Sequence, residues 1–283
     1  MNNIKYFFQF IFIITFFFIF KILGLRLSNI LSAKIFNLLG PLFRSNKISH
    51  QNLSTAFPEL DRIEKDKILK KMWYNYGKIF SEYLFIKEIK ESKNIIVNNQ
   101  EILESIKVDS KPVIFISGHF NNFELMAMHI ENSGIDLAAI YRPLNNKFLN
   151  PIMEKIRKKH ICKKQIKKGL SGTKEILKNF KNGTSIALMI DQRVSEGIKS
   201  KFFNKEAYTT TIPAQFVKKF EARVVPIYIE RTMNDTFRIE INDPIEYKKE
   251  DTIEEITSNL NKILEKMIIK NPEQWIWTHN RWK

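Results

Sequence analysis

The chain has 283 residues, 44% of them hydrophobic, which is enough for a substantial core and excludes a largely disordered protein. Its single cysteine, Cys162, excludes an internal disulfide and a multi-cysteine zinc site. The formal net charge of +16 favours an anionic partner, whether nucleic acid, an anionic membrane or an acidic protein, although a general bias toward lysine explains it equally well.

The N-terminal segment is strongly apolar. Residues 6–20, YFFQFIFIITFFFIF, are interrupted only by Gln9 and Thr15, and the apolar character continues through Leu25. Because about 20 apolar residues cross the hydrocarbon core of a bilayer, we expect residues 1–25 to form a transmembrane or interfacial anchor helix. A removed signal peptide is the alternative, but no small-residue cleavage site follows the apolar run.

The charges that flank the anchor predict its orientation. No acidic residue precedes Glu59, whereas five basic residues follow the apolar run: Lys21, Arg26, Lys34, Arg44 and Lys47. An excess of lysine and arginine beside a membrane segment marks the cytoplasmic side. We therefore expect residues 26–283 to lie on the cytoplasmic face, where this basic surface would also attract anionic lipid headgroups.

Residues 26–283 are expected to form one domain with two parts. Residues 26–100 carry apolar positions at helical spacing and predict a helical lead-in. From residue 111 onward strands and helices alternate, which predicts an α/β core with a mixed, mostly parallel sheet flanked by helices. The expected strands are 113–117, 137–141, 185–190, 223–229 and 236–241, and the expected helices are 146–160, 171–181, 212–220 and 253–269.

A titratable pair lies at the carboxyl end of the first core strand, in KPVIFISGHFNNFELMAMHI (111–130). His119 is expected on a tight turn and Glu124 in the first turn of the next helix. If Glu124 accepts a hydrogen bond from one imidazole nitrogen, the other nitrogen is a general base that can activate a substrate hydroxyl. On spacing alone, however, a turn histidine and a glutamate that favours the helix N-terminus explain the pattern as well.

Five short motifs occur in order along the chain. They are GHFNNFE (118–124), YRPLNN (141–146), MIDQR (189–193), KFFN (201–204) and NPEQWIWTHNRWK (271–283). Together with the apolar N-terminus they resemble the bacterial lipid A biosynthesis acyltransferases, the lauroyl and myristoyl transferases that complete the membrane anchor of lipopolysaccharide. The resemblance covers nearly the whole chain. It implies transfer of a fatty acyl chain from an acyl-carrier-protein thioester to a hydroxyl of a lipid A precursor, at the bacterial inner membrane.

The resemblance also assigns residues to roles. It implies that His119 and Glu124 are the catalytic dyad and that Arg157 is catalytic, as a phosphate clamp or an oxyanion stabiliser, unless it belongs to a solvated basic face. Asp191 matches a strand-end aspartate of the family that orients a basic partner or contributes to substrate binding. The other expected substrate-binding residues are Asn121, Asn122, Arg142 and Gln192. The tryptophans of the C-terminal tail fit either a membrane-interface belt or the core.

The resemblance further implies two anionic partners, the acidic carrier protein and a phosphorylated glycolipid, which suits the eight basic residues and one acidic residue of 154–168. The five histidines show no metal-binding spacing, and no nucleotide-binding glycine motif occurs, so we expect metal-independent chemistry with no cofactor. Three alternatives stay open: acylation of another glycolipid or a lysophospholipid, thioester hydrolysis, and membrane-tethered nucleic-acid binding. No nucleic-acid-binding motif supports the last.

Overall fold

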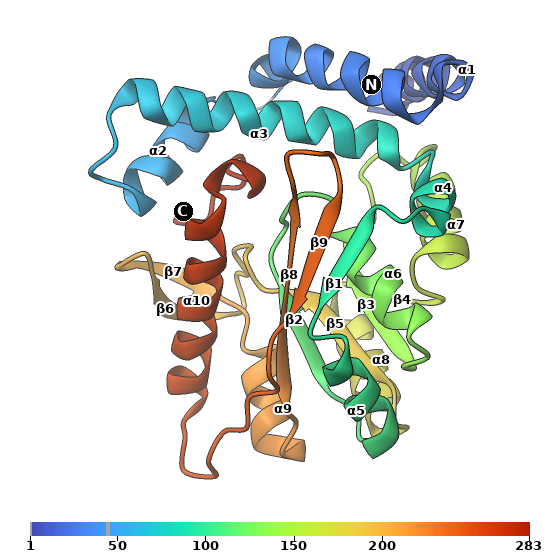
Figure 1. Ribbon diagram of the computed structural model, residues 1–283. Helices are drawn as coiled ribbons and strands as arrows, with labels where there is room; N and C mark the ends of the chain where they lie inside the picture. The colour runs from blue at the N-terminus through green and yellow to red at the C-terminus, as the bar shows by residue number, and fades with distance from the viewer. Residues whose placement is uncertain (1, 44–45) are drawn as a thin grey trace.

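The computed structural model describes residues 2–43 and 46–283, in which helices surround a central sheet (Figure 1). The helices are α1 (Asn2–Phe43), α2 (Asn46–Ala56), α3 (Arg62–Glu82), α4 (Ile86–Glu91), α5 (Glu101–Asp109), α6 (Glu124–Asn132), α7 (Asn150–His160), α8 (Leu170–Lys181), α9 (Ile212–Phe220), α10 (Ile253–Lys270) and the 3-10 helix η1 (Pro272–Gln274). The strands are β1 (Ile95–Asn98), β2 (Ile114–Ser117), β3 (Leu137–Tyr141), β4 (Lys164–Lys167), β5 (Ser185–Met189), β6 (Ile198–Phe202), β7 (Lys205–Thr209), β8 (Val224–Arg231) and β9 (Phe237–Ile241).

The central sheet has seven strands in the order β1-β9-β8-β2-β5-β3-β4. Every neighbouring pair is parallel except β8 and β9, which are antiparallel. All four residues of β2 are buried, as expected for a strand that is covered on both faces. The structure therefore confirms the predicted α/β class with a mixed, mostly parallel sheet.

The strands that the sequence predicted are the buried ones. All five occur, as β2, β3, β5, β8 and β9, within two residues of the expected bounds. The edge strands β1 and β4 were not predicted, because each has only four residues and buries few of them. β1 corrects the expectation that residues 26–100 are all helical, since it pairs with β9 at the edge of the sheet.

A separate hairpin, β6 and β7, forms a second, two-stranded sheet. Phe202 pairs with Lys205, so Phe203 and Asn204 form a two-residue turn, with φ values of 48° and 59°. Positive φ at both positions is typical of a type I′ hairpin turn, and asparagine tolerates it well. This explains why Asn204 can occupy the position where the family resemblance leads us to expect glycine.

The C-terminal tail packs against this hairpin as part of the core. Trp275 and Trp277 are 1% and 0% exposed, and their rings contact each other edge to face at 4.6 Å. The buried guanidinium of Arg281 donates hydrogen bonds to the Tyr208 carbonyl and to Thr209 Oγ1, both at 2.7 Å. The core alternative for the tail is therefore confirmed for these residues, and the membrane-belt alternative is not.

The apolar helix α1 crosses the end of the sheet together with α3 (Figure 1). The segment Asn3–Leu42 is long and apolar enough to cross a membrane. The helix is interrupted at Gly24, where φ is 72° and ψ is 172°. Large apolar side chains are exposed on both sides of this break: Ile4, Phe8, Phe12, Phe18, Ile22, Leu27, Leu38 and Leu42. This pattern is consistent with the predicted membrane-anchoring helix.

Both halves of α1 also contact the folded domain. Ser32 Oγ donates a 2.6 Å hydrogen bond to the carbonyl of Gly77 on α3. A Cβ atom at Gly77 would lie 2.4 Å from the Ser32 carbonyl oxygen, so the two backbones approach this closely only because glycine is there. In the first half, the Tyr6 carbonyl accepts a 2.8 Å hydrogen bond from Asn146 Nδ2. Both halves of α1, the candidate membrane anchor, are thus packed onto the rest of the fold.

Deleting residues 1–25 is expected to release the protein from membranes only in part. Leu27, Leu38 and Leu42 stay exposed on the remaining half of α1, and the basic surface still attracts anionic lipid. Fractionation of cell membranes at low and high salt measures this, and high salt should release more of the truncated chain than of the full chain. A truncated chain that is wholly soluble at low salt would contradict this expectation.

Candidate active site

The register of two central strands brings His119 and Asp191 together. β2 and β5 are parallel neighbours in which Ser117 aligns with Met189. His119 and Asp191 each lie two residues beyond these positions, just past the carboxyl ends of the two strands. The His119 backbone N–H donates to Asp191 Oδ2 at 2.8 Å, and the His119 Nδ1 to Asp191 Oδ1 distance is also 2.8 Å.

Asp191 is built to remain ionised beside the imidazole. It is 1% exposed and accepts a further hydrogen bond, at 2.8 Å, from Trp275 Nε1. Burial alone would raise its pKa, but the charge of His119 and the hydrogen bonds from His119 and Trp275 lower the pKa to about 2. Because an ionised carboxylate only accepts hydrogen bonds, the proton of this contact is on His119 Nδ1.

The imidazole of His119 is correspondingly basic. Burial alone would lower its pKa, but the charge of Asp191 and its hydrogen bond outweigh burial and raise the pKa above 6.5. The His119 side chain is 21% exposed and lines a cavity, and within residues 2–43 and 46–283 no hydrogen bond occupies Nε2. The pair thus holds a basic nitrogen ready for an external proton donor.

Glu124 has different partners from the one that the sequence predicted. It is 6% exposed at the N-terminus of α6 and accepts hydrogen bonds from Arg157 Nε, at 2.8 Å, and from the Tyr83 hydroxyl. His119 Nδ1 is already occupied by Asp191, so the predicted hydrogen bond between His119 and Glu124 is not formed. Glu124 still acts on His119 through space, since its charge helps to raise the imidazole pKa.

Arg157 reaches this site from α7. Its side chain is 12% exposed, which excludes the alternative of a solvated basic face. The guanidinium donates hydrogen bonds to the Glu124 carboxylate and to the Tyr83 hydroxyl. It lies 5.5 Å from the centre of the Tyr141 ring. Burial alone would lower the pKa of Arg157, but the charge of Glu124 and the hydrogen bonds to Glu124 and Tyr83 raise it, so the side chain is a fixed cation.

His119, Glu124 and Arg157 line one cavity of about 380 Å³. Arg142, which is exposed, and Gln192, which is half-buried, line it as well, so two further predicted residues lie at the same site. Most of the remaining wall is apolar: Phe123, Ala127, Ala139, Ile140, Met189 and Ile212. A cavity with an apolar wall and cationic groups fits an amphiphile that carries a polar or anionic end.

Asn121 and Asn122, predicted to bind substrate, lie inside the protein. They are 2% and 1% exposed and do not belong to the lining of this cavity. Asn121 has φ of 40°, and its Nδ2 donates to Gln274 Oε1 at 2.9 Å, while Asn122 Nδ2 donates to Glu82 Oε2 at 2.9 Å. Their physical role is to fix the turn that carries His119, which is why they point into the protein.

A buried ion pair anchors these asparagines. Arg231 at the end of β8 contacts Glu82 at the end of α3 through its two terminal nitrogens, Nη1 at 2.8 Å and Nη2 at 3.0 Å. The Arg231 side chain is 5% exposed and the Glu82 side chain is 1% exposed. Arg231 also donates to Asn121 Oδ1 at 3.2 Å. Asn29 of α1 donates to Glu82 Oε1 at 3.1 Å. The network therefore connects the membrane-anchoring helix with the turn that holds His119.

Sequence reasoning missed several residues of this site. Trp275 was singled out only as part of the tail, and Tyr83, Glu82 and Arg231 carried no motif at all. Their partners lie far away along the chain, as Tyr83 and Glu124 are separated by 41 residues and Glu82 and Arg231 by 149. No local spacing marks such contacts.

Comparison with known proteins gives one consistent family. The family model described as bacterial lipid A biosynthesis acyltransferase matches residues 1–283. The chain is 24% identical to a lipid A biosynthesis palmitoleoyltransferase of Escherichia coli (strain K12), over 86% of this chain and 80% of that protein. It is 25% identical to a lipid A biosynthesis lauroyltransferase of the same strain, over 85% of this chain and 79% of that protein. A myristoyltransferase of that strain matches at 24% identity, over 80% and 71%.

Proposed function

The chain belongs to the bacterial lipid A biosynthesis acyltransferase family, and on this premise we propose that it moves a fatty acyl chain from an acyl-carrier-protein thioester to a hydroxyl of a lipid A precursor. The observation that carries the proposal is the His119–Asp191 pair, which holds a basic imidazole at the wall of an apolar, cation-lined cavity. Within the described part of the chain, no serine or cysteine lines this cavity, which suits direct transfer to a hydroxyl.

In the proposed mechanism His119 Nε2 takes the proton from the acceptor hydroxyl as its oxygen attacks the thioester carbonyl. The resulting tetrahedral intermediate collapses to the new ester, the carbon–sulfur bond breaks, and the imidazolium returns its proton to the leaving carrier thiolate. Asp191 keeps the imidazole in one tautomer and stabilises the imidazolium. Glu124 positions Arg157, whose cationic guanidinium stabilises the oxyanion.

The surface around the cavity supports the proposed partners. Exposed lysines on α7 and just beyond it, Lys155, Lys158, Lys159 and Lys163, form a cationic face suited to an acidic carrier protein. The exposed apolar side chains of α1 suit a lipid environment for the acceptor. We place the catalytic domain on the cytoplasmic face of the bacterial inner membrane, where a carrier protein has access to it.

The test is a reaction of the purified full-length chain with acyl carrier protein carrying a defined acyl chain and a lipid A precursor. Mass spectrometry should show the precursor heavier by one acyl group, with the carrier thiol released. Free fatty acid as the main product would instead indicate thioester hydrolysis, and acylation of lysophospholipid alone would indicate a different acceptor. We also expect the rate to be unchanged by a metal chelator.

Arg157→Lys is expected to lower kcat roughly ten- to hundredfold and to leave the acceptor KM nearly unchanged. Lysine keeps the charge but loses the planar guanidinium that binds Glu124 and Tyr83 together. Steady-state kinetics measure this, with Lys158→Gln/Lys159→Gln as the control, which should mainly reduce efficiency at low carrier concentration and low salt. If both variants behave alike, Arg157 has no role in the transition state.

A further inference from the structure

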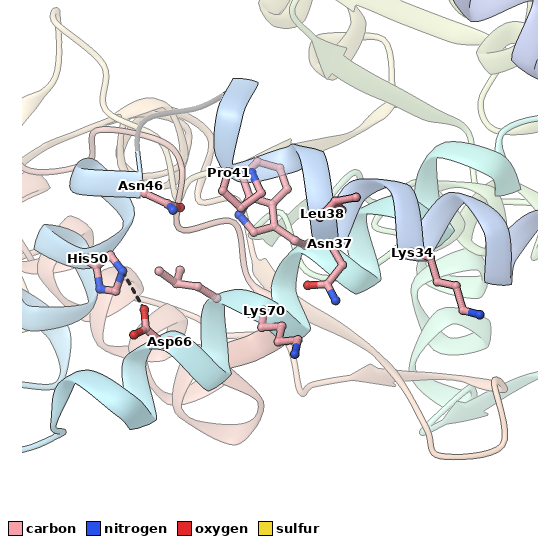
Figure 2. Close-up of a pocket in the computed structure, with 10 residues that line it drawn as sticks. Lys34, Asn37, Leu38, Pro41, Asn46, His50, Asp66 and Lys70 are labelled. Atoms are coloured by element: carbon pink, nitrogen blue, oxygen red, sulfur yellow. Dashed lines mark ion pairs between the residues drawn. The ribbon is translucent and has the colours of Figure 1, made fainter.

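A second cavity lies between the three N-terminal helices, away from the pocket that His119 lines. It measures about 420 Å³, is open to solvent and is lined by residues of α1, α2 and α3 (Figure 2). We call it the headgroup groove, and its walls are Lys34, Asn37, Leu38, Pro41, Asn46, His50, Asp66, Leu69, Lys70 and Trp73. None of these residues lines the pocket at His119 or belongs to the mechanism proposed above.

The lining of the headgroup groove contains two lysines, Lys34 and Lys70, and one carboxylate, Asp66. Its one acidic residue, Asp66, is taken by His50, with 3.0 Å between Oδ1 and Nε2, and Figure 2 shows the two side chains turned toward each other. Among residues 2–43 and 46–283, Lys34 and Lys70 form neither an ion pair nor a side-chain hydrogen bond. Two lysines against a single carboxylate, which also contacts His50, give the cavity a net positive charge that favours an anionic ligand.

The rest of the wall suits a ligand with an apolar part. Leu69 and Trp73 are 4% and 6% exposed and form the floor, and Leu38 forms part of the rim. The Trp73 ring is covered by Gly40, where a Cβ atom would lie 2.3 Å from the ring. The Trp73 ring is thus an apolar part of the wall, and its Nε1 N–H is buried with no acceptor within residues 2–43 and 46–283.

The groove opens on the surface that carries exposed apolar side chains. Leu38 at its rim is 75% exposed, and Leu42, one turn further along α1, is 78% exposed. These residues suit contact with lipid acyl chains, whereas Lys34 and Lys70 suit a phosphate at the level of the headgroups. A lysine-bound phosphate beside an apolar rim is the arrangement that a glycerophospholipid requires.

We propose that the headgroup groove binds the phosphate and glycerol of one anionic glycerophospholipid, whose acyl chains extend along Leu38 and Leu42 into the bilayer. The site is separate from acyl transfer. Trp73 in the groove and Tyr83 at the catalytic pocket are ten residues apart on the same helix axis, or about 15 Å at 1.5 Å per residue. The bound lipid would hold α1, α2 and α3 together at the membrane surface.

The experiment is native mass spectrometry of the full-length chain in non-ionic detergent, titrated with phosphatidylglycerol or with phosphatidylcholine. We expect one phosphatidylglycerol to bind per chain, clearly more tightly than phosphatidylcholine. In Lys34→Gln/Lys70→Gln this binding should weaken about tenfold or more, since two charge-assisted contacts are lost. The matched control is Lys248→Gln/Lys249→Gln, which removes the same charge from exposed residues of the loop between β9 and α10, and it should change binding less than twofold.

The remaining outcomes also decide the proposal. Glycerol 3-phosphate and inorganic phosphate should compete only weakly, and if either displaces phosphatidylglycerol at equal concentration, the ligand is a free anion and the lipid assignment is wrong. Equal binding of both lipids, or equal loss in both lysine variants, would also overturn the proposal. Acyl transfer by Lys34→Gln/Lys70→Gln in detergent should equal that of the unmodified chain, so this result is independent of the proposed function.

Discussion

His119→Ala is expected to lower the rate of acyl transfer by about 10² to 10⁴ while the protein stays folded, because the variant loses its general base. His119 lies just beyond the carboxyl end of β2, and its side chain takes no part in the hydrophobic core. The measurement is the single-turnover rate with purified protein, with circular dichroism as the test of folding. A folded His119→Ala variant with near-normal turnover would reject the mechanism.

Double-mutant cycles identify the carboxylate that acts together with His119. Asp191→Asn and His119→Ala should be strongly non-additive, because the contribution of Asp191 to proton transfer passes through the imidazole. Glu124→Gln should instead be non-additive with Arg157→Lys, because the carboxylate of Glu124 binds that guanidinium. If Glu124 and His119 were the strongly coupled pair, the dyad implied by the family resemblance would be right and the structural pairing would not describe the working site.

The pH dependence gives an independent readout of the same pair. The imidazole must be neutral to accept a proton, and Asp191 raises its pKa above 6.5, so kcat/KM should fall with decreasing pH below that raised value. In Asp191→Asn the raising charge is lost while burial still lowers the pKa. The acidic limb should therefore move to lower pH even though the maximal rate falls. An unchanged acidic limb would show that another group controls it.

Arg231→Met is expected to destabilise the protein by about 3–5 kcal/mol, because it leaves the carboxylate of Glu82 buried without its cation. The loss is measured as the free energy of unfolding in denaturant, with the full-length chain in detergent. Arg238→Met is the matched control. The Arg238 side chain is 45% exposed and pairs with Glu230 at 2.8 Å, so losing this ion pair should lower the free energy of unfolding by about 1 kcal/mol or less.

The ion pair of Arg231 and Glu82 also leads to an expectation about activity. Arg231 binds Asn121, and Glu82 binds Asn122, in the turn between His119 and Glu124. Glu82→Gln/Arg231→Met removes both charges and should recover part of the lost stability, since no uncompensated charge stays buried. Activity should recover less than stability, because the turn has lost the contacts that fix it. Equal stability of Arg231→Met and Arg238→Met would contradict the assigned role of the network.

The fold was predictable where the sequence forms long apolar runs. The strands at 113–117, 137–141 and 223–229 are such runs, and the structure confirms them as β2, β3 and β8. β4 has the sequence KQIK and buries one of its four side chains, so no pattern distinguishes it from a loop. The order of strands, in which β2 lies between β8 and β5, is a property of the whole chain that local periodicity does not encode.

The candidate site was predictable in its residues more than in its pairings. His119 and Asp191 were both placed after strand ends, but they are 72 residues apart, and their contact depends on β2 and β5 being neighbours. Glu124 is only five residues from His119, so local reasoning chose it as the partner. Asn121 and Asn122 lie in the same motif, yet their side chains face Glu82, Arg231 and Gln274, which come from three distant elements. Proximity in sequence was a poor guide to contact in each case.

The attachment of His119 and Asp191 to β2 and β5 has a consequence for how this protein can change. Both strands are interior members of the sheet, and His119 and Asp191 just beyond them are held to each other, whereas Arg142, Lys168 and Gln192 at the cavity are exposed or half-buried. Mutational libraries confined to these three positions can therefore alter substrate preference while the proton-transfer pair stays fixed in place. By the same reasoning, substitutions at the cavity wall can change which acyl donors and acceptors this fold binds, while the residues proposed to transfer the proton stay the same.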